Sequence, residues 1–165
     1  MYKLKKKGNK MLKPSKKFVY FTIRFILVHV ISYIFIGVVF KNFQNYAGAF
    51  ISIEQFSNFR SLDSTIVKLA PLFQILRGAF FAFILYPFYN KIIKSDYAWV
   101  KLFFVIWGFS LVGSPAPIPA SIEGIIYTEM SLTEHLMGLP EITAQIFVFS
   151  WFFVKWENRT ERDYS

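Results

Sequence analysis

The chain has 165 residues, of which 55% are hydrophobic and 21% are aromatic, yet its formal net charge is +9. This composition excludes a disordered chain and is typical of a membrane protein whose apolar segments have basic flanks. The absence of cysteine also excludes a disulfide framework, thiolate metal sites and cysteine catalysis.

Residues 1–17 form a tail with eight lysines and one aromatic residue, Tyr2. Lysine clusters bind either anionic lipid or nucleic acid, and the apolar segment that follows directly favours lipid and no nucleic acid partner. This segment, about 18–40, has 23 residues and exceeds the roughly 20 needed to cross a bilayer. It is also too long for the core of a signal peptide, so we expect a retained transmembrane helix.

The next stretch of the chain contains a predicted outer segment and two further spans. Apolar residues recur every three positions within residues 50–63, which predicts an amphipathic segment on the membrane surface or against the bundle. The second span is predicted at about 69–93, with Pro71 in its first turn. The third, at about 97–113, has 17 residues and is at the short limit for a membrane crossing.

The connection at 114–139 begins with a proline-rich stretch and then carries helix signals of its own. Ser131 and Glu134 have the spacing of a capping box, which predicts a short helix to about Met137. The segment around Glu123 is surrounded by isoleucines and is a candidate to dip into the bundle. Glu123, Glu129, Glu134 and His135 form an acidic outer surface, which is either solvated or offers oxygen ligands to a divalent cation. No spacing here matches a known metal-binding loop, so no metal site and no cofactor are predicted.

The fourth span is predicted at about 140–156, and residues 158–165 are a second tail. Fourteen Lys and Arg residues then lie on the side of the two tails and three on the other side. Loops rich in Lys and Arg stay in the cytoplasm. We therefore expect an all-α bundle of four transmembrane helices over residues 18–157, with both termini cytoplasmic, in a bacterial-type plasma membrane.

Arg77 is the most informative residue, because it lies about 12 Å into the second span. An intramembrane charge costs at least ~2.5–3.5 kcal/mol and should face protein, water or an anion. Gln74 shares its helix face, and a stripe of small residues (Ala70, Gly78 and Ala82) favours close helix packing. Arg77 is either an anchor for an anionic ligand or one half of an ion pair with Glu141 or Glu123.

Three other side chains complete the predicted ligand-binding set of Arg77, Gln74, Glu123, Glu141, Gln145 and His29. Glu141 and Gln145 share a face at the outer start of the fourth span, where Glu141 also complements the helix dipole. His29 lies near the middle of the first span, on a face that carries other polar residues. It is either a neutral, hydrogen-bonded histidine or a ligand, and the lack of a second histidine at its depth argues against haem.

Three functions remain open from the sequence. We favour a non-enzymatic subunit of a larger membrane assembly or homo-oligomer that holds a lipid or another anionic amphiphile near Arg77. The second is an enzyme acting on lipids or isoprenoids at the outer leaflet, with Glu123, Glu134, His135 or Glu141 as acid and base groups. The third is an oligomeric channel or small transporter with an anion path at Arg77. No known catalytic motif supports the second.

Overall fold

The computed structural model describes residues 16–43, 60 and 63–162, and every regular element within these ranges is a helix. The long elements are α1 (Lys16–Phe43), α4 (Ala70–Leu85), α6 (Ala98–Trp107) and α9 (Leu139–Arg162). The short ones are α3 (Thr65–Lys68), the 3₁₀ turn η2 (Tyr86–Phe88), α5 (Tyr89–Ile92), the π-helical segment η3 (Gly108–Val112), α7 (Ile122–Tyr127) and α8 (Leu132–Met137).

The predicted spans correspond to these helices, with differences at their ends. The second predicted span is not one α-helix, because the 3₁₀ turn at Pro87 separates α4 from α5. The third ends in a π-helical turn, closed by a hydrogen bond from the Gly113 N–H to the Gly108 carbonyl. The helix of the fourth predicted span continues to Arg162, so residues 158–162 of the predicted tail are helical. The predicted amphipathic segment at 50–63 lies outside the described residues except for Arg60 and Asp63.

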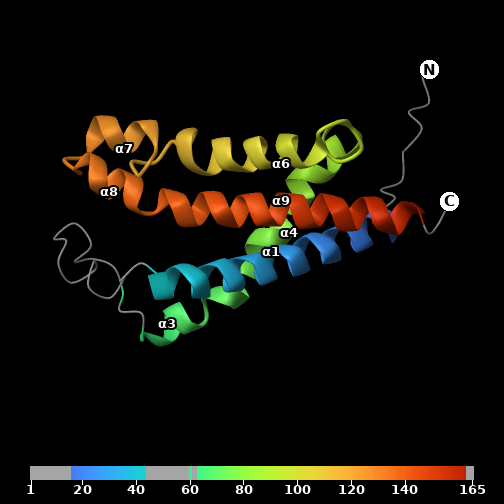
Figure 1. Cartoon of the computed structure of the whole chain (residues 1–165), viewed down its shortest axis with the longest axis horizontal. Helices are drawn as coiled ribbons and strands as arrows, with labels where there is room; N and C mark the ends of the chain where they lie inside the picture. The colour runs from blue at the N-terminus through green and yellow to red at the C-terminus, as the bar shows by residue number, and fades with distance from the viewer. Residues whose placement is uncertain (1–15, 44–59, 61–62, 163–165) are drawn as a thin grey trace, which may run out of the picture.

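The long helices pack side by side in the order α4, α1, α9 and α6. α1 contacts α4 and α9, and α9 contacts α6. The start of α1 and the end of α9 lie at one end of the bundle, whereas α7 and α8 lie at the other end (Figure 1). A short turn at residues 93–97 joins α5 to α6, with Tyr97 in the left-handed region at a φ of 55°.

Aromatic rings fill the core between α1 and α9. Phe25 is fully buried, and its ring centroid lies 4.7 Å from that of Phe149 and 4.9 Å from that of Phe153. Such edge-to-face pairs stabilise beyond the area that they bury. Gly78 and Ala82 of α4 are buried, as the small-residue stripe predicts.

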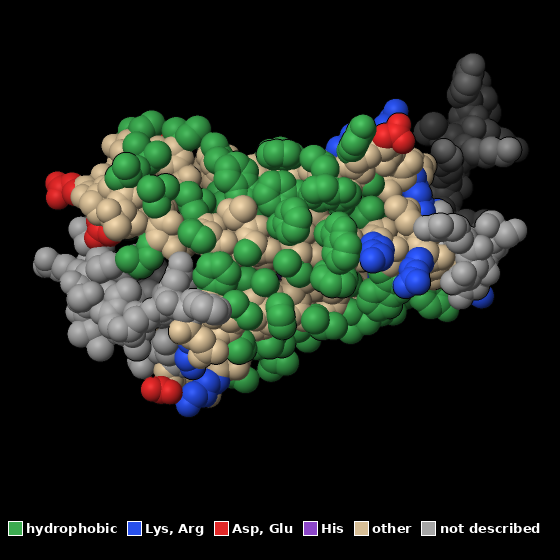
Figure 2. All heavy atoms as spheres, viewed as in Figure 1, with side chains coloured by type: hydrophobic (Ala, Val, Ile, Leu, Met, Phe, Trp, Pro, Cys, Tyr) green, Lys and Arg blue, Asp and Glu red, His purple; other side chains and the backbone are tan. Residues whose placement is uncertain are grey.

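Much of the apolar surface faces outward. Large hydrophobic side chains are exposed along all four long helices, among them Ile31, Leu76, Phe104 and Phe152 at 52–73%. Figure 2 shows hydrophobic side chains across the middle of one face and charged side chains gathered toward its ends. A water-exposed surface of this kind is unusual in a soluble monomer, whereas lipid covers it without cost.

Three helical stretches are long and apolar enough to cross a membrane: Lys16–Asn42, Ala70–Ile92 and Leu132–Thr160. The stretch Ala98–Val112 is also apolar but shorter. The chain is thus an all-helical protein with helices compatible with a membrane location. The fourth crossing stays a prediction.

Candidate functional site

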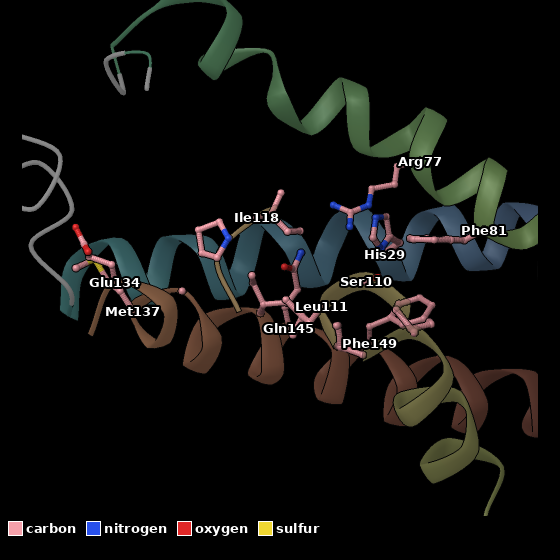
Figure 3. Close-up of a pocket in the computed structure, with 15 residues that line it drawn as sticks. His29, Arg77, Phe81, Ser110, Leu111, Ile118, Glu134, Met137, Gln145 and Phe149 are labelled. Carbon is pink, nitrogen blue, oxygen red and sulfur yellow. The ribbon is translucent and has the colours of Figure 1, made fainter. Parts of the chain in front are cut away.

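Arg77 lines a cavity of about 400 Å³ between the helices. The residue is exposed, so the cavity is open to the outside of the bundle at this position. Figure 3 shows its guanidinium group beside His29, toward the same space as Gln145 and Ser110. The guanidinium carbon lies 5.5 Å from the centre of the Phe81 ring, a cation–π distance. Arg77 thus lines the cavity from its open side and is not enclosed by the bundle.

The position of Arg77 follows from the close approach of α4 to α1 at the next residue. A Cβ atom on Gly78 would lie 3.3 Å from the Ile26 Cα and 3.3 Å from the His29 Cδ2. These contacts are tighter than most Cβ contacts in proteins, so glycine lets the two helices approach closely here, as small residues do between other membrane helices. This contact holds the start of the Arg77 side chain next to α1.

His29 and Gln74 form a polar contact between α1 and α4 on the same side. The His29 Nε2 and the Gln74 Oε1 are 3.2 Å apart, and since an amide oxygen accepts, the imidazole N–H donates. The rings of Phe81 and Phe149 lie edge-on to the imidazole at centroid distances of 6.2 and 5.7 Å. His29 is therefore a hydrogen-bonded histidine at the wall of the cavity, and the structure brings it together with Arg77 and Gln74.

The remaining walls of the cavity come from α6, η3, α8 and α9. Most are apolar, with Ile106, Leu111, Ile142 and Ile146 among them. The added polar side chains are Ser110, Gln145 and Glu134. A mainly apolar cavity with a few polar groups and one cation is suited to an amphipathic ligand.

Glu123 and Glu141, the predicted ion-pair partners of Arg77, do not line the cavity. Within the described part of the chain, Arg77 makes no hydrogen bond or ion pair. Glu141 lies instead against α1, where a Cβ on Gly37 would be 3.8 Å from its Oε1. Glu123 is partly buried in the first turn of α7. The alternative in which Arg77 belongs to an internal ion pair is therefore not supported.

The outer connection is held together by its own polar side chains. The predicted capping box is confirmed: the Ser131 N–H donates to Glu134 Oε2 at 2.6 Å, and the Glu134 N–H donates to Ser131 Oγ at 3.3 Å. The predicted helix end at Met137 is also confirmed. His135 is buried, and its Nδ1 accepts from the Ala120 N–H at 3.2 Å. Both side chains thus have structural partners, which weakens their candidacy as acid and base groups.

The isoleucines near Glu123 do not enter the bundle. Ile122, Ile125 and Ile126 are 53–62% exposed, whereas Ser121 and Gly124 face inward and are buried. In the described ranges, no three His, Asp or Glu side chains lie close enough together to hold a metal ion.

A second polar cluster, which the sequence analysis missed, joins the helices at the other end. Glu157 is 1% exposed and accepts two hydrogen bonds from Arg24, at 2.6 and 2.9 Å, and one from the Tyr89 hydroxyl at 3.0 Å. The signal that could have revealed the pair is that Arg24 is a charge within the first apolar segment, and Glu157 is an acidic residue at the end of the fourth, which lies at the same end of the bundle.

Comparison with known proteins gives no assignment: no protein-family model, curated protein or solved structure matches the chain.

Proposed function

We propose that this chain is a multi-pass membrane protein that holds an anionic amphiphile in the Arg77 cavity. The observation that carries the proposal is a guanidinium group that lines a mainly apolar cavity and has no ion-pair partner among the described residues. A charge within the membrane region needs an anion or water. A phosphate or carboxylate headgroup would supply that anion, and the apolar walls would cover the hydrocarbon part of the same molecule.

The proposal does not require catalysis. Glu134 and His135, two of the four candidate acid and base groups, are engaged with backbone groups of their own loop. The polar side chains that line the cavity are His29, Arg77, Ser110, Glu134 and Gln145. This set supports binding and orientation of a ligand more directly than proton transfer at one of its bonds.

The proposal includes a topology of four crossings with both termini in the cytoplasm. It rests on the excess of Lys and Arg in the two tails and in the connection between α5 and α6. It also includes assembly with other membrane subunits or with further copies. The exposed isoleucines of α7 offer a surface for that assembly, and the mass of the purified particle tests it.

Lipid analysis of the purified protein tests the ligand. The protein is extracted in mild detergent, and the molecules that copurify are identified by mass spectrometry. We expect a stoichiometric phosphate- or carboxylate-bearing amphiphile in the native protein and at least a tenfold loss of it in Arg77→Gln. Arg60→Gln is the matched control, because it removes an exposed arginine that does not line the cavity.

The two sources of the anion are distinguished in the same experiment. A lipid headgroup predicts retention of a molecule with an acyl or isoprenoid chain, whereas a free anion predicts binding of inorganic phosphate to delipidated protein. Equal retention by Arg77→Gln and the native protein, with both variants folded, would overturn the proposal.

A further inference from the structure

A second groove runs between α1 and α9, away from the Arg77 cavity. Its volume is about 610 Å³, and it shares no lining residue with that cavity. Its apolar walls include Ile31 and Phe35 from α1, and Val148 and Phe152 from α9. Ile31, Phe35 and Phe152 are 52–62% exposed, so the groove is open along its length.

The groove has a basic end. Lys155, Trp156 and Arg159 line it near the end of α9, and the two cations are one helical turn apart on the same helix face. The Lys155 Nζ lies 4.5 Å from the centre of the Trp151 ring, which holds it beside the groove. Among the residues with described side chains, neither cation has an ion-pair partner. Figure 2 shows Lys and Arg side chains at this end of the face, next to the hydrophobic surface.

The length of the groove corresponds to one leaflet. From Arg159 back to Val148 is eleven positions of α9, or about 16 Å at 1.5 Å per residue. This is about half of the ~30 Å thickness of the hydrocarbon core. Trp156 lies at the basic end, and tryptophan is enriched where the headgroups meet the hydrocarbon.

We propose that this groove binds an anionic phospholipid of the leaflet next to the start of α1 and the end of α9. Lys155 and Arg159 bind its phosphate, and an acyl chain lies against Ile31, Phe35 and Phe152. The site is independent of the proposed function, because it uses other residues and another face of α1.

Fluorescence quenching by brominated lipid tests the site. A variant that keeps Trp156 alone (W99F/W107F/W151F) is reconstituted in phosphatidylcholine vesicles that contain brominated phosphatidylglycerol or brominated phosphatidylcholine. Each cation near the surface contributes about a fivefold preference for anionic lipid, so we expect stronger quenching of Trp156 by phosphatidylglycerol, with a relative association constant of at least five. A variant that keeps Trp99 alone, on α6, should show a smaller preference, because Trp99 does not line the groove.

Two double substitutions separate the groove from general surface charge. K155Q/R159Q should remove the preference at Trp156. K91Q/K101Q should retain it, because these lysines carry the same charge near the same end but do not line the groove.

Equal quenching by the two lipids, or a preference that survives K155Q/R159Q, would overturn the proposal. So would protection of Trp156 from both lipids, which would indicate a second copy in the groove. Arg77→Gln should leave the preference unchanged, which keeps this test separate from that of the cavity.

Discussion

Glu157 shows how a buried charge is accommodated in this bundle. Its carboxylate accepts hydrogen bonds from both the Arg24 guanidinium and the Tyr89 hydroxyl, and these three residues come from α9, α1 and α5. Charges in such surroundings are stabilised only when they are paired and hydrogen-bonded. The cluster therefore joins three helices at the end of the bundle where α1 begins.

Glu157→Gln should lower the free energy of unfolding by about 3 kcal/mol, because it leaves the mostly buried Arg24 without its counter-ion. Denaturant unfolding in detergent micelles measures the change. The double variant R24Q/E157Q should be less destabilised than the sum of the two single variants. The neighbouring Asn158→Ala is the control and should cost only about 1 kcal/mol, since it removes a neutral acceptor of the Lys94 hydrogen bond. Additive single effects would contradict the pairing.

The sequence predicted which polar residues share a face of one helix better than it predicted their partners on other helices. Gln74 and Arg77 are three residues apart on α4 and so lie on the same side of that helix, where His29 contacts Gln74 and lines the cavity together with Arg77 and Gln145. Arg24 and Glu157 are 133 positions apart, and no periodicity relates residues on different helices. For the same reason, sequence spacing could not establish whether Glu141 or Glu123 lies beside Arg77.

At the scale of the elements, the connection at 114–139 depends on one close backbone contact. Ser121 begins α7, and its hydroxyl oxygen accepts from the Gly124 N–H at 2.8 Å. A Cβ on Gly124 would lie 2.1 Å from the Ile118 carbonyl oxygen, which is a severe clash with backbone. The loop and the first turn of α7 therefore fit together only with glycine at this position.

Gly124→Ala should displace α7 and destabilise the outer connection by about 2 kcal/mol, as other overpacked sites do. Limited proteolysis measures this as faster cleavage within residues 114–131. Gly138→Ala is the matched control, because its added Cβ would have no neighbour closer than 3.9 Å. If both variants are as resistant as the native protein, the Ile118 contact does not restrict the loop.

The helix ends illustrate which element features can be predicted. The capping box at Ser131 and the early proline of α4 are local signals, and both occur as expected. The sequence pattern predicted continuous helix through both the π-helical turn at Gly108 and the 3₁₀ turn at Pro87. Pro87 is a local signal for the second, because proline has no N–H to donate inside a helix. Hydrophobicity likewise indicated the end of the fourth span but not the end of helix α9, which continues to Arg162.

At the scale of the whole molecule, the number of membrane crossings depends on whether the short apolar stretch between α5 and the outer connection crosses the bilayer. Ala98–Val112 has fifteen residues and is about 22 Å long if fully α-helical, less than the ~30 Å hydrocarbon core. A thinner local bilayer or the flanking residues must compensate if this stretch crosses the membrane. The turn before it and the connection after it would then lie on opposite sides.

Single cysteines test this directly, because the chain has none of its own. Asn90→Cys and Thr133→Cys place the thiol at exposed positions on either side of the short stretch. In intact cells we expect a membrane-impermeant maleimide to label Thr133→Cys, and to label Asn90→Cys only after permeabilisation. Labelling of both from the same side would exclude a crossing by this stretch and leave three spans.

Gly78 has no side chain, and this affects the geometry of the cavity beside Arg77. α4 approaches α1 closely there, and a methyl group on residue 78 would lie 3.3 Å from the Ile26 Cα, so a neighbouring group would have to shift by a few tenths of an ångström. Arg77 is the next residue along α4 and lines the cavity, so the separation of the two helices at Gly78 determines where its side chain starts. A residue outside the cavity wall therefore bears on the geometry of the charged part of that wall.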